Sequence, residues 1–278
     1  MIKFMARTVT LALIIIMFGI FTQVTSAQDD SAFFEDYLLE NGDSIEADFV
    51  DGVNAHLYAF LASRGDVVTI SMTQLDPESN LLDPYLILLN AQGSVVAVDD
   101  DGGDLFLSAQ IKDARIPAND VYYVIALDSY GRRFAADTYI DNLDNPMSYE
   151  LSLRGANEPD DYELPDFAMM EYGDQLSLEV TQDTATAFAL FEGEDGDSVT
   201  ITTADAGDNI DTILYLFNPA GSRVAVNDDG EGYYSQIDSY QLEEDGIYFI
   251  LATVWGYEQS VDTPPWQNGG RFILSLDN

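Results

Sequence analysis

The sequence contains an internal repeat, and this repeat constrains the fold more than any other feature. Residues 82–102 read LDPYLILLNAQGSVVAVDDDG, and residues 210–230 read IDTILYLFNPAGSRVAVNDDG. The two segments align without a gap, so that Asp83 corresponds to Asp211 and Gly93 corresponds to Gly221. A repeat of this length, within two halves of similar size, predicts two copies of one domain.

Both halves show short apolar runs broken by Gly, Asn, Asp and Pro, which is the pattern of β-strands separated by turns. In the first half we predict strands at 44–49, 55–61, 66–73, 84–90, 94–99, 108–116, 121–128 and 148–154. In the second half we predict them at 175–180, 186–192, 197–203, 212–218, 222–227, 235–242, 247–253 and 271–276. Eight short strands per half, without a helical period, predict an all-β protein of two tandem β-sandwich domains.

The predicted domains have defined bounds and a defined core. We place a signal peptide at residues 1–27, the first sandwich at 28–155 and the second sandwich at 156–278. We expect the core faces to hold the following side chains: Val68, Ile70, Leu86, Leu88, Tyr122 and Val124 in the first half, and Val199, Ile201, Leu214, Leu216, Tyr248 and Ile250 in the second.

The first residues have the pattern of an export signal. Lys3 and Arg7 form a short basic start, residues 9–21 are largely apolar, and Thr25 and Ala27 occupy the small-residue positions of a cleavage site. The apolar run is shorter than the roughly 20 residues of a membrane-spanning helix, which disfavours an uncleaved anchor. We therefore expect cleavage after Ala27, a secreted or periplasmic location, and no attachment to a membrane afterwards.

The composition excludes several classes of function. The chain has 50 Asp and Glu against 10 Lys and Arg, and two of the ten basic residues lie in the signal, which leaves 50 against 8 and a charge of −42. Such a charge repels nucleic acid and anionic membranes and attracts cations. The absence of cysteine from the sequence excludes disulfides and thiolate metal sites. We therefore expect no nucleic-acid partner, and calcium as the ion that would relieve the self-repulsion.

The order of motifs in the second half resembles a known family. Residues 157–161 read NEPDD, 196–201 read GDSVTI, 210–216 read IDTILYL, 226–230 read VNDDG and 246–250 read GIYFI. This series resembles the bacterial pre-peptidase C-terminal domain, a family that includes the collagen-binding domains of secreted clostridial collagenases. The resemblance covers nearly all of the second half and, more loosely, the first half from Asp29. It implies a jelly-roll-like sandwich on secreted proteins that serves as a binding or folding accessory, with calcium in some members.

The Asp-rich loops are the first candidate metal sites. Each places several oxygen ligands and a Gly turn within a few residues, as calcium prefers, although the same residue types also make plain hairpin turns. The candidate ligands are Asp99, Asp100 and Asp101 in the first loop, Asn227, Asp228 and Asp229 in the second, and the strand-initial Asp83 and Asp211. The family resemblance implies a second calcium site in the linker, with Glu158, Asp160 and Asp161 as the matching ligands.

One loop of the second half is a candidate ligand-binding surface. It contains Trp255, Tyr257 and Trp266, and both tryptophans of the chain are among them. Exposed aromatic side chains in sandwich modules stack on sugars or grip a protein strand, whereas buried ones would close the end of the sandwich. The sequence leaves these two alternatives open.

Catalysis has little support in the sequence. The single histidine, His56, corresponds to Ala187 in the second half, and we expect it at a surface or edge position rather than in a catalytic site. We therefore expect a secreted, non-catalytic protein that recognises an extracellular polysaccharide or protein, or that assists a secreted peptidase. The alternatives are a hydrolase that uses paired carboxylates and a structural unit of an extracellular matrix, which would self-associate. The oligomeric state is left open.

Overall fold

Strands and turns make up the part of the chain that the structure describes, and no described residue is helical. The structure is a computed structural model, and it describes residues 38–50, 52–76, 82–128, 146–160, 168–181, 184, 186–208, 210–230, 232–254 and 269–278. Within these ranges it has no helix that is long and apolar enough to cross a membrane. The predicted signal peptide lies outside the described residues. The all-β prediction is confirmed.

The first half forms two antiparallel sheets, with the strand orders β1-β8-β3-β6 and β2-β7-β4-β5. This is the jelly-roll order, in which each strand is followed by one in the other sheet, except that β4 and β5 are neighbours in the same sheet. The strands are β1 Ser44–Phe49, β2 Ala55–Ala62, β3 Val67–Gln74, β4 Pro84–Asn90, β5 Val95–Asp99, β6 Ala109–Arg115, β7 Asp120–Asp128 and β8 Met147–Arg154.

The second half repeats this topology strand for strand. Its sheets have the orders β10-β17-β12-β15 and β14-β13-β16-β11-β9, and no sheet mixes strands of the two halves. The strands are β9 Ala168–Met170, β10 Gln175–Val180, β11 Thr186–Gly193, β12 Ser198–Asp205, β13 Thr212–Phe217, β14 Arg223–Asn227, β15 Gln236–Gln241, β16 Gly246–Val254 and β17 Gly270–Asp277. All sixteen predicted strands are present within two residues of their expected bounds. The short β9, which pairs in parallel with β11, was not predicted.

Each half has its own core between its two sheets. In β8 the burial alternates along the strand, so that Tyr149, Leu151 and Leu153 point inward while Glu150 and Arg154 point outward. All twelve predicted core residues lie in these two cores. The predicted core faces are therefore confirmed.

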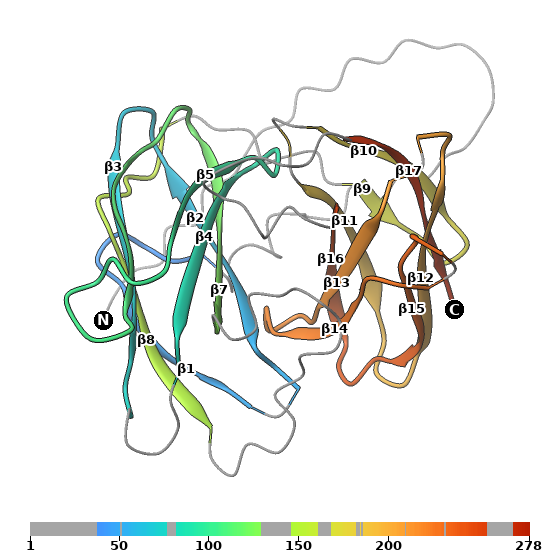
Figure 1. Cartoon of the computed structure of the whole chain (residues 1–278), viewed down its shortest axis with the longest axis horizontal. Helices are drawn as coiled ribbons and strands as arrows, with labels where there is room; N and C mark the ends of the chain where they lie inside the picture. The colour runs from blue at the N-terminus through green and yellow to red at the C-terminus, as the bar shows by residue number, and fades with distance from the viewer. Residues whose placement is uncertain are drawn as a thin grey trace, which may run out of the picture. The chain divides into compact units, whose positions relative to one another are not determined.

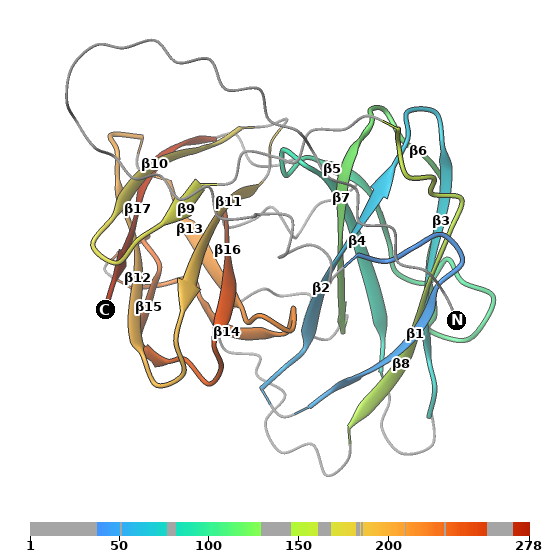
Figure 2. The ribbon, with the colours of Figure 1, turned by 180° about the vertical axis from the view of Figure 1, so that it is seen from behind.

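A third core joins the two halves, and the sequence did not predict it. Residues 31–278 form one compact unit, in which the sheet of β2, β7, β4 and β5 faces the sheet of β11, β16, β13 and β14 (Figures 1 and 2). The central strands β7 and β16 are accordingly buried on both faces. Aromatic rings fill the middle of this core, with the ring centroids of Phe188 and Phe249 5.0 Å apart and those of Tyr123 and Phe188 5.5 Å apart.

The contacts between the halves are reciprocal. Thr186 Oγ1, on the edge of the second half, donates a hydrogen bond to the carbonyl of Gly93 over 3.2 Å. The corresponding glycine of the second half, Gly221, accepts a hydrogen bond of 2.8 Å from the amide of Leu57. A Cβ atom at Gly93 would lie 2.2 Å from Thr186 Oγ1, so only glycine allows this approach. Each half thus presents the same turn to the corresponding strand of the other, β11 or β2.

Candidate metal centre

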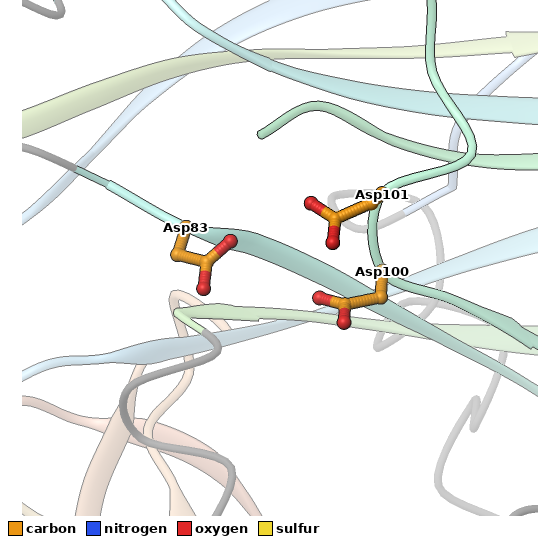
Figure 3. A group of neighbouring side chains, drawn as sticks. All are labelled: Asp83, Asp100 and Asp101. Atoms are coloured by element: carbon orange, nitrogen blue, oxygen red, sulfur yellow. The ribbon is translucent and has the colours of Figure 1, made fainter. Parts of the chain in front are cut away.

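Three carboxylates of the first half converge where two paired strands end. Asp83 directly precedes β4, and Asp100 and Asp101 directly follow β5. Because β4 and β5 are antiparallel, with Leu86 opposite Asp99, the start of one strand lies beside the end of the other. One oxygen from each of the three carboxylates lies within 4.8 Å of the others. Figure 3 shows these side chains directed toward a shared space.

The cluster is partly shielded from water. Asp83 and Asp100 are half-buried, and one oxygen of each is fully covered, whereas Asp101 is exposed. The backbone of Asp83 is held in place by the buried Asp128, whose Oδ1 accepts a hydrogen bond of 3.0 Å from the Asp83 amide. Negative groups this close repel one another, so the arrangement favours a bound cation.

Asp99, a further predicted ligand, shapes the loop. Its Oδ2 accepts hydrogen bonds from the amides of Gly102, over 2.8 Å, and Gln110, over 2.7 Å. In the second half the Oδ1 of Asn227 accepts a hydrogen bond of 2.7 Å from the amide of Gln236. Asp99 and Asn227 therefore share a structural role, because each ties its loop to the following strand.

The second half repeats the arrangement with a different electrostatic outcome. Asp211 occupies the position of Asp83, and Asp228 and Asp229 follow β14 as Asp100 and Asp101 follow β5. Burial, and then the negative charges of Asp229 and Asp228, raise the pKa of Asp211 to about 6. Within the described ranges, the close grouping of three acidic side chains is found in the first half alone.

The linker does not form such a group in the part that is described. Asn157 binds the turn before β3, where its backbone amide and its side-chain amide donate hydrogen bonds of 2.7 and 2.8 Å to the carboxylate of Asp66. Glu158 and Asp160 are exposed. Asp161 lies outside the described residues, and so do Trp255, Tyr257 and Trp266. The linker site and the aromatic surface therefore stay predictions.

His56 corrects one expectation. It lies on β2, at the edge of its sheet, but its side chain is buried rather than at the surface. Its Nδ1 lies 2.6 Å from the hydroxyl of Tyr149, and that hydroxyl lies 2.7 Å from the hydroxyl of Tyr58. Burial lowers the pKa of His56 to about 4, although the charge of Asp48 partly opposes the shift. The apolar residues around His56 in β2 were consistent with burial, but no sequence signal identified its tyrosine partner.

The comparisons with known proteins point to one family. The family model of the bacterial pre-peptidase C-terminal domain matches residues 186–253, which include β11 to β16 and the Asp211 loop. The expected resemblance is thereby confirmed for this part of the second half. No curated protein sequence matches the chain.

Solved structures with a similar arrangement include domains of secreted and peptidase proteins. The pre-peptidase C-terminal domain of a collagenase from Bacillus anthracis is 11% identical, with a TM-score of 0.32, over 44% of this chain and 99% of that domain. Tripeptidyl peptidase 2 is 12% identical, with a TM-score of 0.26, over 86% of this chain and 24% of that protein. A putative secreted protein from Eubacterium rectale is 10% identical, with a TM-score of 0.25, over 84% of this chain and 72% of that protein.

Proposed function

We propose that this is a secreted, non-catalytic binding or accessory protein that calcium stabilises through its Asp-rich loops. The observation that carries the calcium proposal is the convergence of Asp83, Asp100 and Asp101, whose ligand oxygens lie within 4.8 Å of one another. The accessory role is supported by the match of residues 186–253 to the pre-peptidase C-terminal family, whose domains occur in secreted proteins as non-catalytic modules.

The residues of the loop fit the coordination chemistry of calcium. Calcium takes about six to eight oxygen ligands in a flexible geometry. Three carboxylates offer up to about six oxygens, and backbone carbonyls or water can complete such a set. A cation bound there would also offset the repulsion within a chain of formal charge −40. Asp211, Asp228 and Asp229 form the second proposed site, at the corresponding position of the repeat.

The test is a calcium titration of thermal stability. An ion that binds only the folded state stabilises it by mass action, by about 2.7 kcal/mol at a concentration 100 times its Kd. We expect millimolar calcium to raise the Tm, and the double variant Asp100→Asn/Asp101→Asn to lose much of that response. Glu46→Gln changes an exposed carboxylate on β1 and should keep the response in full. Equal Tm shifts from calcium and from sodium of the same ionic strength would mean charge screening without a site.

The same variants distinguish the alternative function. If the protein were a hydrolase with paired carboxylates, it would turn over a polysaccharide or a peptide, and a single Asp substitution would abolish that turnover. Calcium-dependent stability without turnover supports the binding protein. The predicted partner, an extracellular polysaccharide or protein, and its recognition by Trp255, Tyr257 and Trp266 stay predictions.

A further inference from the structure

Basic side chains are rare in this protein, yet most of those in the described ranges gather on one surface. These ranges contain six Lys and Arg side chains. The two that lie in the second half already have partners, because Arg223 is buried and donates to Asn54 Oδ1 of the first half while Arg271 pairs with Asp208 over 3.3 Å. The other four are exposed on the outer sheet of the first half or in the turn that leads into it: Arg64, Lys112, Arg115 and Arg154.

The strand register places these four side chains around Thr69. Arg154 on β8 is directly opposite Thr69 on β3. On the other side, β6 bulges, and the amide of Asp113 lies 3.4 Å from Thr69 Oγ1, which places Lys112 beside the same residue. Val68 and Ile70 point into the core, so Thr69 and its neighbours face outward. Arg115 is opposite Val67, one step along the same face, and Arg64 lies in the preceding turn.

This group, called the basic surface below, is not neutralised by ion pairs within the described part of the chain. Within the described residues, the structure shows an ion pair between Arg271 and Asp208, which lie in the second half and not on the basic surface. Carboxylates adjoin this surface: that of Asp113 lies in the bulge, and that of Asp66, which accepts hydrogen bonds from Asn157, lies in the turn before β3. Glu40 and Asp43 belong to the turn that hydrogen-bonds the residues on either side of Arg154. The basic surface therefore keeps cationic groups that are available to an anionic partner.

The corresponding surface of the second half carries the opposite charge. Thr200 takes the place of Thr69, with Asp277 directly opposite it and the bulge amide of Ser239 3.1 Å from its hydroxyl. When Thr69 is aligned with Thr200, Arg154 corresponds to Asp277, Lys112 to Asp238 and Arg64 to Asp195. Asp195, Asp238 and Asp277 are all exposed, and they form the acidic surface.

The two surfaces face away from each other within one chain. The basic surface lies on the sheet of β1, β8, β3 and β6, and the acidic surface lies on the sheet of β10, β17, β12 and β15. The inner faces of these sheets cover the cores of their own halves, and the third core lies between the two remaining sheets. The complementary surfaces therefore meet only between different molecules.

We propose that the basic surface of one molecule binds the acidic surface of a second copy, so that molecules associate head to tail. The basic and the acidic surface lie at corresponding positions of the two halves, and their complementary charges would fix the orientation of the contact. The contact is heterologous, because it joins different surfaces of two identical chains, and it leaves a free surface at each end for further copies. Exposed charge pairs are individually weak, so the association depends on concentration and salt.

Charge-reversal variants test this contact by sedimentation velocity of the mature protein. A chelator is present, so that the outcome does not depend on the proposed calcium sites. At an ionic strength of about 0.1 M the Debye screening length is about 10 Å. Under this condition we expect wild-type protein to form oligomers whose size increases with protein concentration. At about 1 M salt it should be monomeric. Lys112→Asp/Arg154→Asp and Asp238→Lys/Asp277→Arg should each weaken self-association at least tenfold.

Mixing the two variants is the decisive step. Each keeps one intact surface, and the two reversed surfaces are complementary to each other, so an equimolar mixture should regain the self-association that neither variant shows alone. The two variants also distinguish an effect of this specific contact from an effect of net charge. The first variant makes the chain more negative, and the second makes it less negative. If net charge controlled association, their effects would be opposite. That result, or wild-type protein that stays monomeric at every concentration, would overturn the proposal. A monomer that binds a sulfated polysaccharide through Lys112 and Arg154 would overturn it as well and identify a polyanion as the partner.

Discussion

The two halves share one topology but bury different polar groups. In the first half, His56, Tyr149 and Tyr58 form a buried chain of hydrogen-bonding groups between β2 and β8. The corresponding residues of the second half are Ala187, Phe272 and Ala189, which carry no polar side-chain atoms. The second half therefore closes the same region with apolar side chains alone.

The second half has a polar cluster of its own, at a different place. Thr203 Oγ1 and Thr212 Oγ1 are 2.6 Å apart, and Ser235 Oγ donates to the carbonyl of Thr212 over 2.5 Å. All three residues are buried. The corresponding residues of the first half are Met72, Pro84 and Ala109, whose side chains make no hydrogen bonds.

This difference shows that the strand order does not depend on any one polar contact. Each cluster satisfies its own buried donors and acceptors, as a buried polar group must. The features common to both halves are the apolar faces, the turn glycines and the bulge at Asp113 and Ser239. The apolar pattern thus supports the topology, and the polar clusters distinguish the two copies.

The largest expected effect concerns the core that the halves share. Phe249 is 1% exposed and contacts rings of both halves, Tyr123 in the first and Phe188 in the second. Phe249→Ala should lower the free energy of unfolding by about 3–5 kcal/mol, because it opens a cavity in a packed core. Guanidinium denaturation measures this loss, and Phe106→Ala, at a side chain that is 81% exposed, should change stability by less than about 0.5 kcal/mol.

The same experiment tests whether the halves unfold together. Near-ultraviolet circular dichroism follows the packing of the aromatic rings in this core, whereas far-ultraviolet circular dichroism follows the strands of both halves. A shared core predicts coincident wild-type transitions. Two separate transitions would show that the third core does not couple the halves.

The next effect is the pH dependence that the buried His56 gives to the first half. Because burial lowers the pKa of His56 to about 4, from about 6.5 in the unfolded chain, the unfolded state binds the proton more tightly. The contribution of neutral His56 is therefore present above pH 6.5 and is lost progressively as the pH falls to about 4. The loss amounts to about 3 kcal/mol.

Comparison with His56→Ala isolates this effect from the carboxylates that both proteins share. The difference in unfolding free energy between wild type and variant should shrink as the pH falls from 7 to 4. Chemical denaturation at several pH values measures it. A difference that stays constant over this range would contradict the assigned pKa shift.

A smaller effect is expected from exchanging the polar groups of the two halves. Ser235→Ala introduces the residue that the first half has at this position, and it removes a hydrogen bond to the buried carbonyl of Thr212. We expect a loss of about 1–3 kcal/mol. The reciprocal Ala109→Ser should also destabilise, because it places a hydroxyl at a position of the packed core that is 0% exposed. Neutral results for both variants in thermal denaturation would show that the clusters are interchangeable.

The smallest effect concerns the two acidic loops. The folded-state pKa of Asp211 is raised to about 6, so this carboxyl stabilises the fold below about pH 3.8, and that contribution is lost as the pH rises through 6. At pH 7 in a chelator, Asp211→Asn should therefore raise stability, by less than about 1 kcal/mol because the group is partly exposed. In calcium the same variant should weaken the stabilisation that the ion provides. A lower Tm in the chelator would contradict this account.

Most of the fold could be predicted because strands leave a local pattern. In β3 and β12 the core residues alternate with largely polar neighbours, and the turn residues mark where each strand ends. β9 escaped detection because three residues are too few to show a period. The candidate metal centre was partly predictable, since paired strands bring Asp83 beside Asp100 and Asp101. The role of Asp99 was not, because the same carboxylate can bind a cation or a backbone amide.

The sequence by itself determined the duplication, the positions of sixteen strands along the chain, twelve core residues and the acidic loops, because each of these depends on residues close together in the chain. Tertiary structure alone decided what the second face of β7 and β16 covers. The sequence of a fully apolar strand does not indicate whether its second face is covered by its own domain or by the neighbouring one. It also decided that His56 meets Tyr149, 93 residues away, and that Arg154 and Lys112 lie on either side of Thr69. Such contacts arise from strand pairing over long sequence separations, which no local pattern records.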